Sequence, residues 1–147
     1  WTAGNVTVTD NDVKSPEGVV NAAKLLASDD TTAVNHQVDS GDFSIVSGSV
    51  TGSVFAKKGN VDFVRLRLNA TTAQTRAWFD LENGTVETVD ATDSGAFGTI
   101  VDMGDGWYRC SVTEPNNTAA QSSAELQIFI NESDGQTSWI GDGDEYI

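Results

Sequence analysis

The sequence has few of the residues on which catalytic and metal centres are commonly built. It contains one cysteine, Cys110, and one histidine, His36, among 147 residues. A single cysteine excludes an internal disulfide framework and zinc sites built on cysteine pairs. A single histidine excludes multi-histidine metal centres and leaves little room for a Ser-His-Asp site. No motif selects a pair of carboxylates of the kind that glycosidases use, so the sequence predicts neither an enzyme nor a required cofactor.

Basic residues and long apolar runs are also scarce. Eight lysines and arginines stand against 22 aspartates and glutamates, which gives a net charge of −14 at pH 7. This balance argues against nucleic-acid binding through a broad phosphate-contacting surface. No stretch approaches the roughly 20 apolar residues of a membrane span, so membrane insertion is not predicted. The acidity favours solubility and is compatible with an extracellular, saline or virion setting.

The size of the chain predicts one domain with an ordinary core. Its 147 residues are 38% hydrophobic, which is enough to form a core without disulfides. The sequence starts at Trp1 without an initiator Met or a signal-peptide pattern, and Asp144–Ile147 resembles the start of a strand. We therefore expect the natural protein to continue beyond Ile147.

Short segments of alternating apolar and polar residues lie between turns rich in Gly, Asn and Asp. The apolar residues of the three clearest segments are Val64, Leu66 and Leu68; Tyr108, Cys110 and Val112; and Ala124, Leu126, Ile128 and Ile130. Alternation with a period of two is typical of strands that bury one face, which also makes Cys110 a small buried side chain. Segments 49–57, 76–81 and 97–103 are weaker examples, and segment 17–27 fits a strand better than a helix. The sequence predicts an all-β, antiparallel, two-sheet sandwich.

The polar residues that alternate with this core form a candidate ligand-binding face, provided that their strands share one sheet. The candidate contacts are Arg65, Arg67, Trp78, Trp107, Arg109, Gln127 and Phe129. Aromatic rings stack on pyranose rings, and planar guanidinium and amide groups bind paired hydroxyls or carboxylates. Three arginines on one face of an acidic chain favour uronic or sulfated sugars.

The same residues also have a purely structural interpretation. The arginines would pair with Glu125 or Asp80 in exposed ion pairs, which contribute little to stability, and the tryptophans would pack beneath loops. Trp139 is a further aromatic candidate for which we expect burial. His36, in a polar segment, is expected to be a surface or hydrogen-bonded side chain.

Acidic turns leave open a structural calcium ion. They occupy residues 29–30, 39–42, 131–134 and 142–145. Calcium needs six to eight oxygen ligands, and the sequence contains no EF-hand pattern. No metal-binding residues are therefore assigned, and the alternative is that these aspartates hydrogen-bond the backbone of their turns.

The most distinctive stretch is Gly-Asp-Gly-Trp-Tyr-Arg-Cys-Ser-Val-Thr at 104–113, accompanied by Trp-Phe-Asp-Leu at 78–81, Ile-Phe-Ile at 128–130 and Gly-Asp-Gly at 141–143 before Tyr-Ile. Together these motifs resemble a family of carbohydrate-binding-module-like jelly-roll domains. Such domains recur in phage tail and other virion proteins and beside polysaccharide-degrading enzymes of marine bacteria. The resemblance covers nearly the whole chain.

The resemblance implies a jelly-roll sandwich and glycan recognition. It also implies that residues 1–147 form a single domain lacking one N-terminal and one C-terminal strand of the family pattern. Because a fold does not establish a function, two hypotheses stay open. The first is a non-catalytic carbohydrate-binding module that recognises a polysaccharide, which could be anionic. The second is a structural subunit of a virion or filament, such as a capsid decoration, tail or fibre protein, that contacts copies of itself or other subunits. Both imply an extracellular or virion-surface location.

Overall fold

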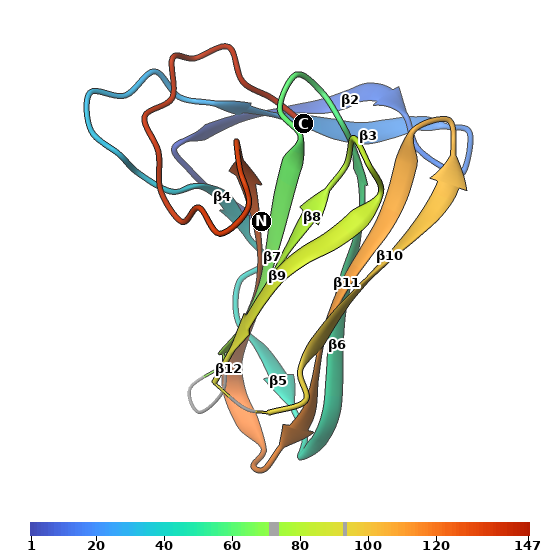
Figure 1. The fold of residues 1–147 in the computed structure, drawn as a ribbon, viewed down its shortest axis with the longest axis vertical. Helices are drawn as coiled ribbons and strands as arrows, with labels where there is room; N and C mark the ends of the chain where they lie inside the picture. The colour runs from blue at the N-terminus through green and yellow to red at the C-terminus, as the bar shows by residue number, and fades with distance from the viewer. Residues whose placement is uncertain (71–73, 93) are drawn as a thin grey trace.

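The computed structural model describes residues 1–70, 74–92 and 94–147, and within them the chain forms β-strands and no helix (Figure 1). The strands are β1 (Thr2–Gly4), β2 (Val6–Lys14), β3 (Val20–Ala27), β4 (His36–Asp39), β5 (Phe43–Ile45), β6 (Gly48–Lys57), β7 (Phe63–Asn69), β8 (Gln74–Asp80), β9 (Thr85–Ala91), β10 (Phe97–Gly104), β11 (Trp107–Asn117) and β12 (Gln121–Asn131). Segment 17–27 contributes β3, so the strand interpretation of that segment is correct.

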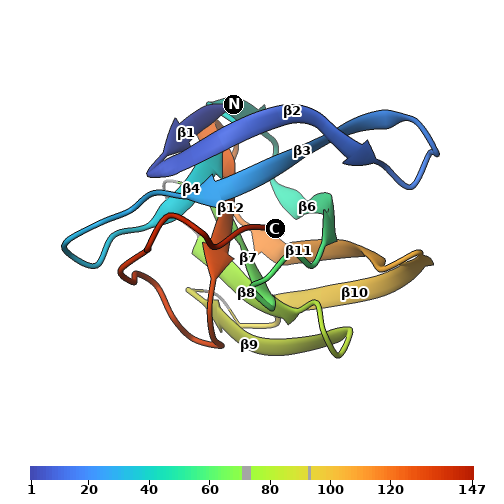
Figure 2. The same cartoon turned by 90° about the horizontal axis from the view of Figure 1, so that it is seen from above.

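Two antiparallel sheets face each other and form a sandwich. The long sheet has the strand order β1-β4-β12-β7-β8-β9, with β5 also pairing with β12, and the short sheet has the order β10-β11-β6. Strand β11 contacts β7 and β8, and β10 contacts β9, so the short sheet covers the long one (Figure 1). The β2–β3 hairpin crosses one end of the sandwich (Figure 2). This architecture confirms the predicted antiparallel sandwich, whereas jelly-roll connectivity stays a prediction.

The turns follow the predicted Gly and Asp chemistry. In the β10–β11 hairpin, Gly104, Asp105 and Gly106 have φ values of 83°, 53° and 77°. Side chains with a Cβ rarely adopt this left-handed region, which Gly and Asp tolerate best. The Gly-Asp-Gly sequence therefore sets the position at which β10 turns back and starts β11.

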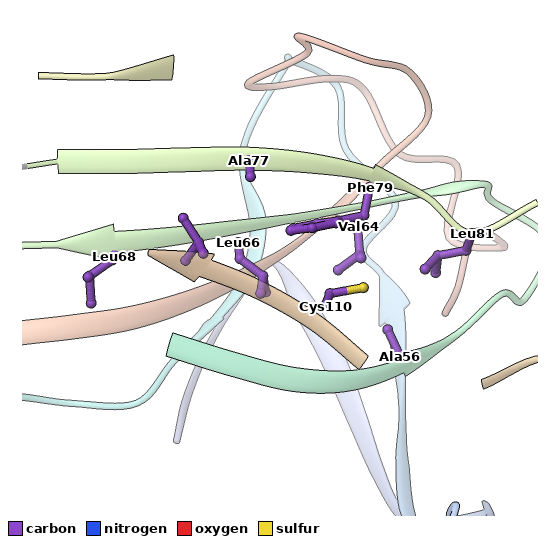
Figure 3. Close-up of a cluster of buried hydrophobic side chains, with 9 residues drawn as sticks. Ala56, Val64, Leu66, Leu68, Ala77, Phe79, Leu81 and Cys110 are labelled. Atoms are coloured by element: carbon purple, nitrogen blue, oxygen red, sulfur yellow. The ribbon is translucent and has the colours of Figure 1, made fainter. Parts of the chain in front are cut away.

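The core lies between the two sheets and is made by the predicted alternation. Leu66, Phe79, Cys110 and Val112 are all 0% exposed, and Figure 3 shows the side chains of this cluster directed into the space between the strands. The prediction that Cys110 is a small buried side chain is confirmed. Burial raises the pKa of its thiol to about 12, which disfavours the reactive thiolate.

A second apolar cluster lies under the β2–β3 hairpin and includes Leu25, Ala27, Val38, Ile130 and Trp139. The indole nitrogen of Trp139 donates to the Ile130 carbonyl at 3.1 Å, which confirms its expected burial. The ring of His36 lies 4.3 Å from that of Trp139. His36 is 1% exposed, and its Nε2 lies 2.9 Å from Asp30 Oδ2. Of the two expectations for His36, a surface side chain or a hydrogen-bonded one, the structure shows the hydrogen-bonded one.

Candidate functional site

The outer face of the long sheet collects five of the seven candidate ligand contacts. Strands β12, β7 and β8 are neighbours in that sheet, and their registers place Gln127 opposite Arg67 and Phe129 opposite Arg65. Arg65 lies in turn opposite Trp78. Residues directly opposite each other on antiparallel strands point to the same face. The five side chains therefore share one surface, as the sequence predicts for these strands.

Trp107 and Arg109 do not lie on that surface, so the expectation of one common face is wrong for them. Both belong to β11, in the short sheet. Arg109 is exposed on the outer side of that sheet, beside Phe55, which is 50% exposed. Trp107 is 7% exposed, and its indole nitrogen donates to the Lys14 carbonyl at 3.1 Å. Alternation assigns a residue to one side of its own strand, but it does not assign the strand to a sheet.

The aromatic side chains on the outer face of the long sheet are buried. Trp78 is 2% exposed, Phe129 is 1% exposed and Arg65 is 3% exposed. The Arg65 guanidinium carbon lies 3.6 Å from the Phe129 ring centroid and 5.4 Å from that of Trp78. The carbonyl of Gln136 accepts from the Trp78 indole at 2.8 Å and from Arg65 at 3.4 Å. The loop after β12 thus covers these rings, as in the structural interpretation.

Burial lowers the pKa of Arg65 but leaves its guanidinium charged. Desolvation, followed by repulsion from Arg76 and Arg67, lowers its pKa to about 10. The guanidinium is therefore still charged at neutral pH. A charge held this deeply contributes a constant positive potential beneath the neighbouring part of the face.

Next to the closed rings lies a line of polar side chains, which we call the polar row; Gln127 within it is buried at 6% exposure, and its other members are half-buried or exposed. Cross-strand register aligns its five members, Asp39, Gln127, Arg67, Arg76 and Asp90. Arg76 donates to Asp90 Oδ2 at 3.2 Å. Arg67 donates to the amide oxygen of Asn69 at 3.0 Å rather than to a carboxylate.

The expected pairing of these arginines with Glu125 or Asp80 is not found. Glu125 accepts from the amides of Asn69 at 3.3 Å and Gln127 at 3.1 Å. Asp80 instead accepts from Glu82 N and Asn83 N at 2.8 and 2.9 Å in the β8–β9 turn. On this face an ion pair forms instead between Arg76 and Asp90. These two residues are 14 positions apart in the sequence and become neighbours because β8 pairs with β9.

A cleft of about 730 Å³ lies between the β2–β3 hairpin and β6. Its lining includes Leu25, Val54 and Trp107. Tyr146 and Ile147 at the end of the chain also line this cleft, and Ile147 exchanges main-chain hydrogen bonds with Leu25 at 3.1 and 3.2 Å. This cleft could not be recognised in the sequence, because its walls come from segments about 30 to 120 residues apart and no local motif marks it.

The acidic turns use their carboxylates within the chain. Asp30 accepts from Ser28 at 2.7 Å, and this bond together with His36 lowers the pKa of Asp30 despite the opposing effect of burial. Asp134 accepts from Thr88, and Glu145 accepts from the Asp142 main chain. In the described part of the chain, no three His, Cys, Asp or Glu side chains are grouped so that they could hold a metal ion. The structural calcium stays a prediction without assigned ligands.

Comparison with known proteins adds no identification. The chain matches no protein-family model and no curated protein sequence. Among the described residues there is also no helix long and apolar enough to cross a membrane. The resemblance to carbohydrate-binding jelly-roll domains therefore stays a prediction, and function has to be argued from the surfaces of the sandwich.

Proposed function

We propose that this chain is a non-catalytic carbohydrate-binding module that recognises a polysaccharide through the outer face of the long sheet. The observation that carries this proposal is the polar row. It aligns two carboxylates, one amide and two guanidiniums across five adjacent strands. The half-buried amides of Gln37, Asn69 and Gln74 flank it.

Such a row suits a sugar chain because its groups are planar, polar and held by a rigid sheet. Paired hydroxyls of a sugar accept and donate hydrogen bonds with the spacing of guanidinium, amide and carboxylate groups. Side chains on paired strands keep a more constant geometry than side chains on loops. Because Trp78 and Phe129 are closed off, recognition here depends on hydrogen bonds rather than on ring stacking. A module of this kind would be part of a secreted protein or would lie on the surface of a virion.

The proposal is tested on a glycan array that carries neutral, uronic and sulfated polysaccharides. The wild-type chain is expected to bind at least one of them. The double variant Gln37→Ala, Asn69→Ala removes two flanking amides and should weaken that binding about tenfold, since each hydrogen bond contributes about 0.5–1.5 kcal/mol.

The matched control is Ser53→Ala, Thr99→Ala, which removes two polar groups from strands of the short sheet. It should bind as the wild type does. A folded wild-type chain that binds no polysaccharide on the array contradicts the proposal. A loss that is equal in both double variants contradicts the assignment to this face.

A second candidate function, a structural subunit of a virion or filament, is favoured by the cleft. Strand β6 is at the edge of the short sheet. On the β3 edge, Leu25 N and Ala27 N bond Ile147 O and Glu145 O, and Ala23 is the next residue on that edge because alternate residues of a strand bond to the same side. An extended segment entering the cleft would therefore meet strand edges on both walls.

Unpaired strand edges are the usual acceptors of a strand from another molecule. A strand donated by a second copy would join β3 to β6 and convert the hairpin and the short sheet into one sheet. This candidate predicts a self-associating protein, whereas the first predicts sugar binding by the monomer.

A further inference from the structure

Among the described residues, Arg65 and Arg67 have no carboxylate partner, although the chain is dominated by carboxylates. Neither guanidinium forms an ion pair within 4.0 Å in the described part of the chain, although the sequence contains 22 aspartates and glutamates against eight lysines and arginines. The Nε atoms of both side chains are buried and have no hydrogen-bond partner in residues 1–70, 74–92 and 94–147. A buried or half-buried charge without a counter-ion is costly, so the missing partner calls for an explanation.

The two carboxylates that act electrostatically on Arg67, Asp39 and Glu125, are bonded to amides instead. Both oxygens of Asp39 accept from the Gln37 amide at 3.0 Å. Glu125 accepts from Asn69 and Gln127. These amides satisfy the carboxylates and leave the positive charge of Arg67 without a carboxylate.

The arginines also repel one another. Arg67 lies directly opposite Arg76 and two residues along the same strand from Arg65. Burial, and after it repulsion from Arg76, lowers the pKa of Arg67, although Glu125 and Asp39 partly oppose this. An anion between these guanidiniums would offset both the burial and the repulsion.

Two of the three arginines are accessible to a ligand. Arg67 is half-buried, and the side chain of Arg76 is 30% exposed. The pair that Arg76 forms with Asp90 joins two solvent-accessible groups and holds Arg76 only weakly. Arg65 is sealed under the loop after β12 and acts through its charge alone.

We propose that Arg67 and Arg76 bind the carboxylate or sulfate group of an acidic polysaccharide, with Arg65 as a fixed positive charge beside them. This inference rests on the proposed function and narrows its ligand to an anionic polymer. A net charge of −14 opposes any anion at long range, so binding has to come from local contacts. A polymer that also hydrogen-bonds along the polar row provides more of these contacts than a small free anion.

The test is affinity electrophoresis at 150 mM NaCl in gels that contain polygalacturonate, dextran sulfate or neutral dextran. Polygalacturonate tests the carboxylate and dextran sulfate tests the sulfate. We expect the wild type to be retarded by at least one acidic polymer and not by neutral dextran. Arg67→Gln should weaken the interaction about tenfold or more, because charge-assisted bidentate bonds are the strong ones.

Arg109→Gln is the matched control, because it removes the same charge from the exposed face of the other sheet. It should leave retardation nearly unchanged. If Arg67→Gln does not fold, as judged by circular dichroism, Arg76→Gln replaces it, and an unchanged retardation of that variant counts against the inference.

The outcomes separate this inference from the proposed function. Equal losses in Arg67→Gln and Arg109→Gln would show that only net charge matters and would overturn the inference. Binding to neutral dextran that is insensitive to Arg67→Gln would also overturn it, while polysaccharide binding itself would stand. A folded chain that binds no polymer in the gels would overturn the anionic site, and the glycan array would then decide whether the proposed function fails with it.

Discussion

Asp80 illustrates how a single carboxylate organises a turn. It is 8% exposed, and it accepts from Glu82 N, Asn83 N and the Asn83 amide at 2.7 to 2.9 Å. Burial opposes its ionised form, but the bonds from Asn83 and Glu82, with a further effect of Lys58, outweigh burial and lower its pKa below the ordinary 3.8. The charge of Asp80 therefore stabilises the folded state.

This linkage predicts a pH-dependent effect of Asp80→Asn. The stabilisation from a depressed carboxylate pKa is complete above the unfolded value near 3.8 and is lost as the pH falls through the lower folded value. At pH 7 the free energy of unfolding of the variant should be about 1–3 kcal/mol lower than that of the wild type. Urea unfolding at pH 7, 4 and 2.5 should show the difference shrinking towards pH 2.5.

Asp42→Asn, at an exposed position, is the control for Asp80→Asn and should change the free energy of unfolding by less than about 0.5 kcal/mol. A difference between wild type and Asp80→Asn that stays constant from pH 7 to 2.5 would mean that the charge of Asp80 does not contribute.

At the scale of elements, the segment after β12 is held by sparse but specific contacts. It forms isolated antiparallel bridges from Trp139 to Val34, from Asp142 to Asp29 and from Tyr146 to Leu26. Gly141 packs closely against the rest of the chain, since an added Cβ there would lie 2.3 Å from the carbonyl oxygen of Ser28. Only a residue without a side chain lets the segment dock there.

Gly141→Ala should therefore undock this segment and lower the free energy of unfolding by about 1–3 kcal/mol, as overpacking does. Hydrogen exchange should accelerate at the amides of Asp30 and Val34, which donate to Gly141 O and Trp139 O. Gly4→Ala is the control, since its Cβ would come no closer than 3.4 Å to any neighbour, and that neighbour is the flexible Gln37 side chain. Unchanged exchange at both amides in Gly141→Ala would contradict this account of docking.

At the scale of the whole molecule, the strand edges of β3 and β6 at the cleft provide a test of the structural-subunit candidate. If a second copy donates a strand, sedimentation velocity from 1 to 200 μM should show concentration-dependent association. Ala23→Pro removes a main-chain donor from the β3 edge and should weaken that association about fivefold or more. Ala23→Ser keeps the donor and should behave as the wild type does. A chain that stays monomeric throughout would contradict strand donation by a second copy.

The buried and exposed sides of the clearest strands could be predicted, because alternation depends only on neighbours in the sequence. Alternation identified Leu66, Cys110 and Val112 as strand residues that face the core, and all three are 0% exposed. The hairpin glycines were also recognisable, since positive φ is a local demand. The face that carries Arg65, Arg67 and Gln127 followed from the same alternation, once β7 and β12 proved to be neighbours.

The amino-acid sequence alone determined that segments such as 64–68, 108–112 and 124–130 become strands and which side of each is polar, because these properties depend on residues a few positions apart. Strands β1, β4, β5 and β9 were not predicted from the sequence and emerged only from the pairing of strands in the folded chain. The tertiary structure alone decided that Arg67 and Arg109 lie on different sheets and that Trp78 and Trp107 are buried on the polar sides of their strands. It also decided that Arg67 has an amide where a carboxylate was expected. Strand pairing and loop closure join residues tens of positions apart, and the free energy of these contacts exists only after the chain has folded.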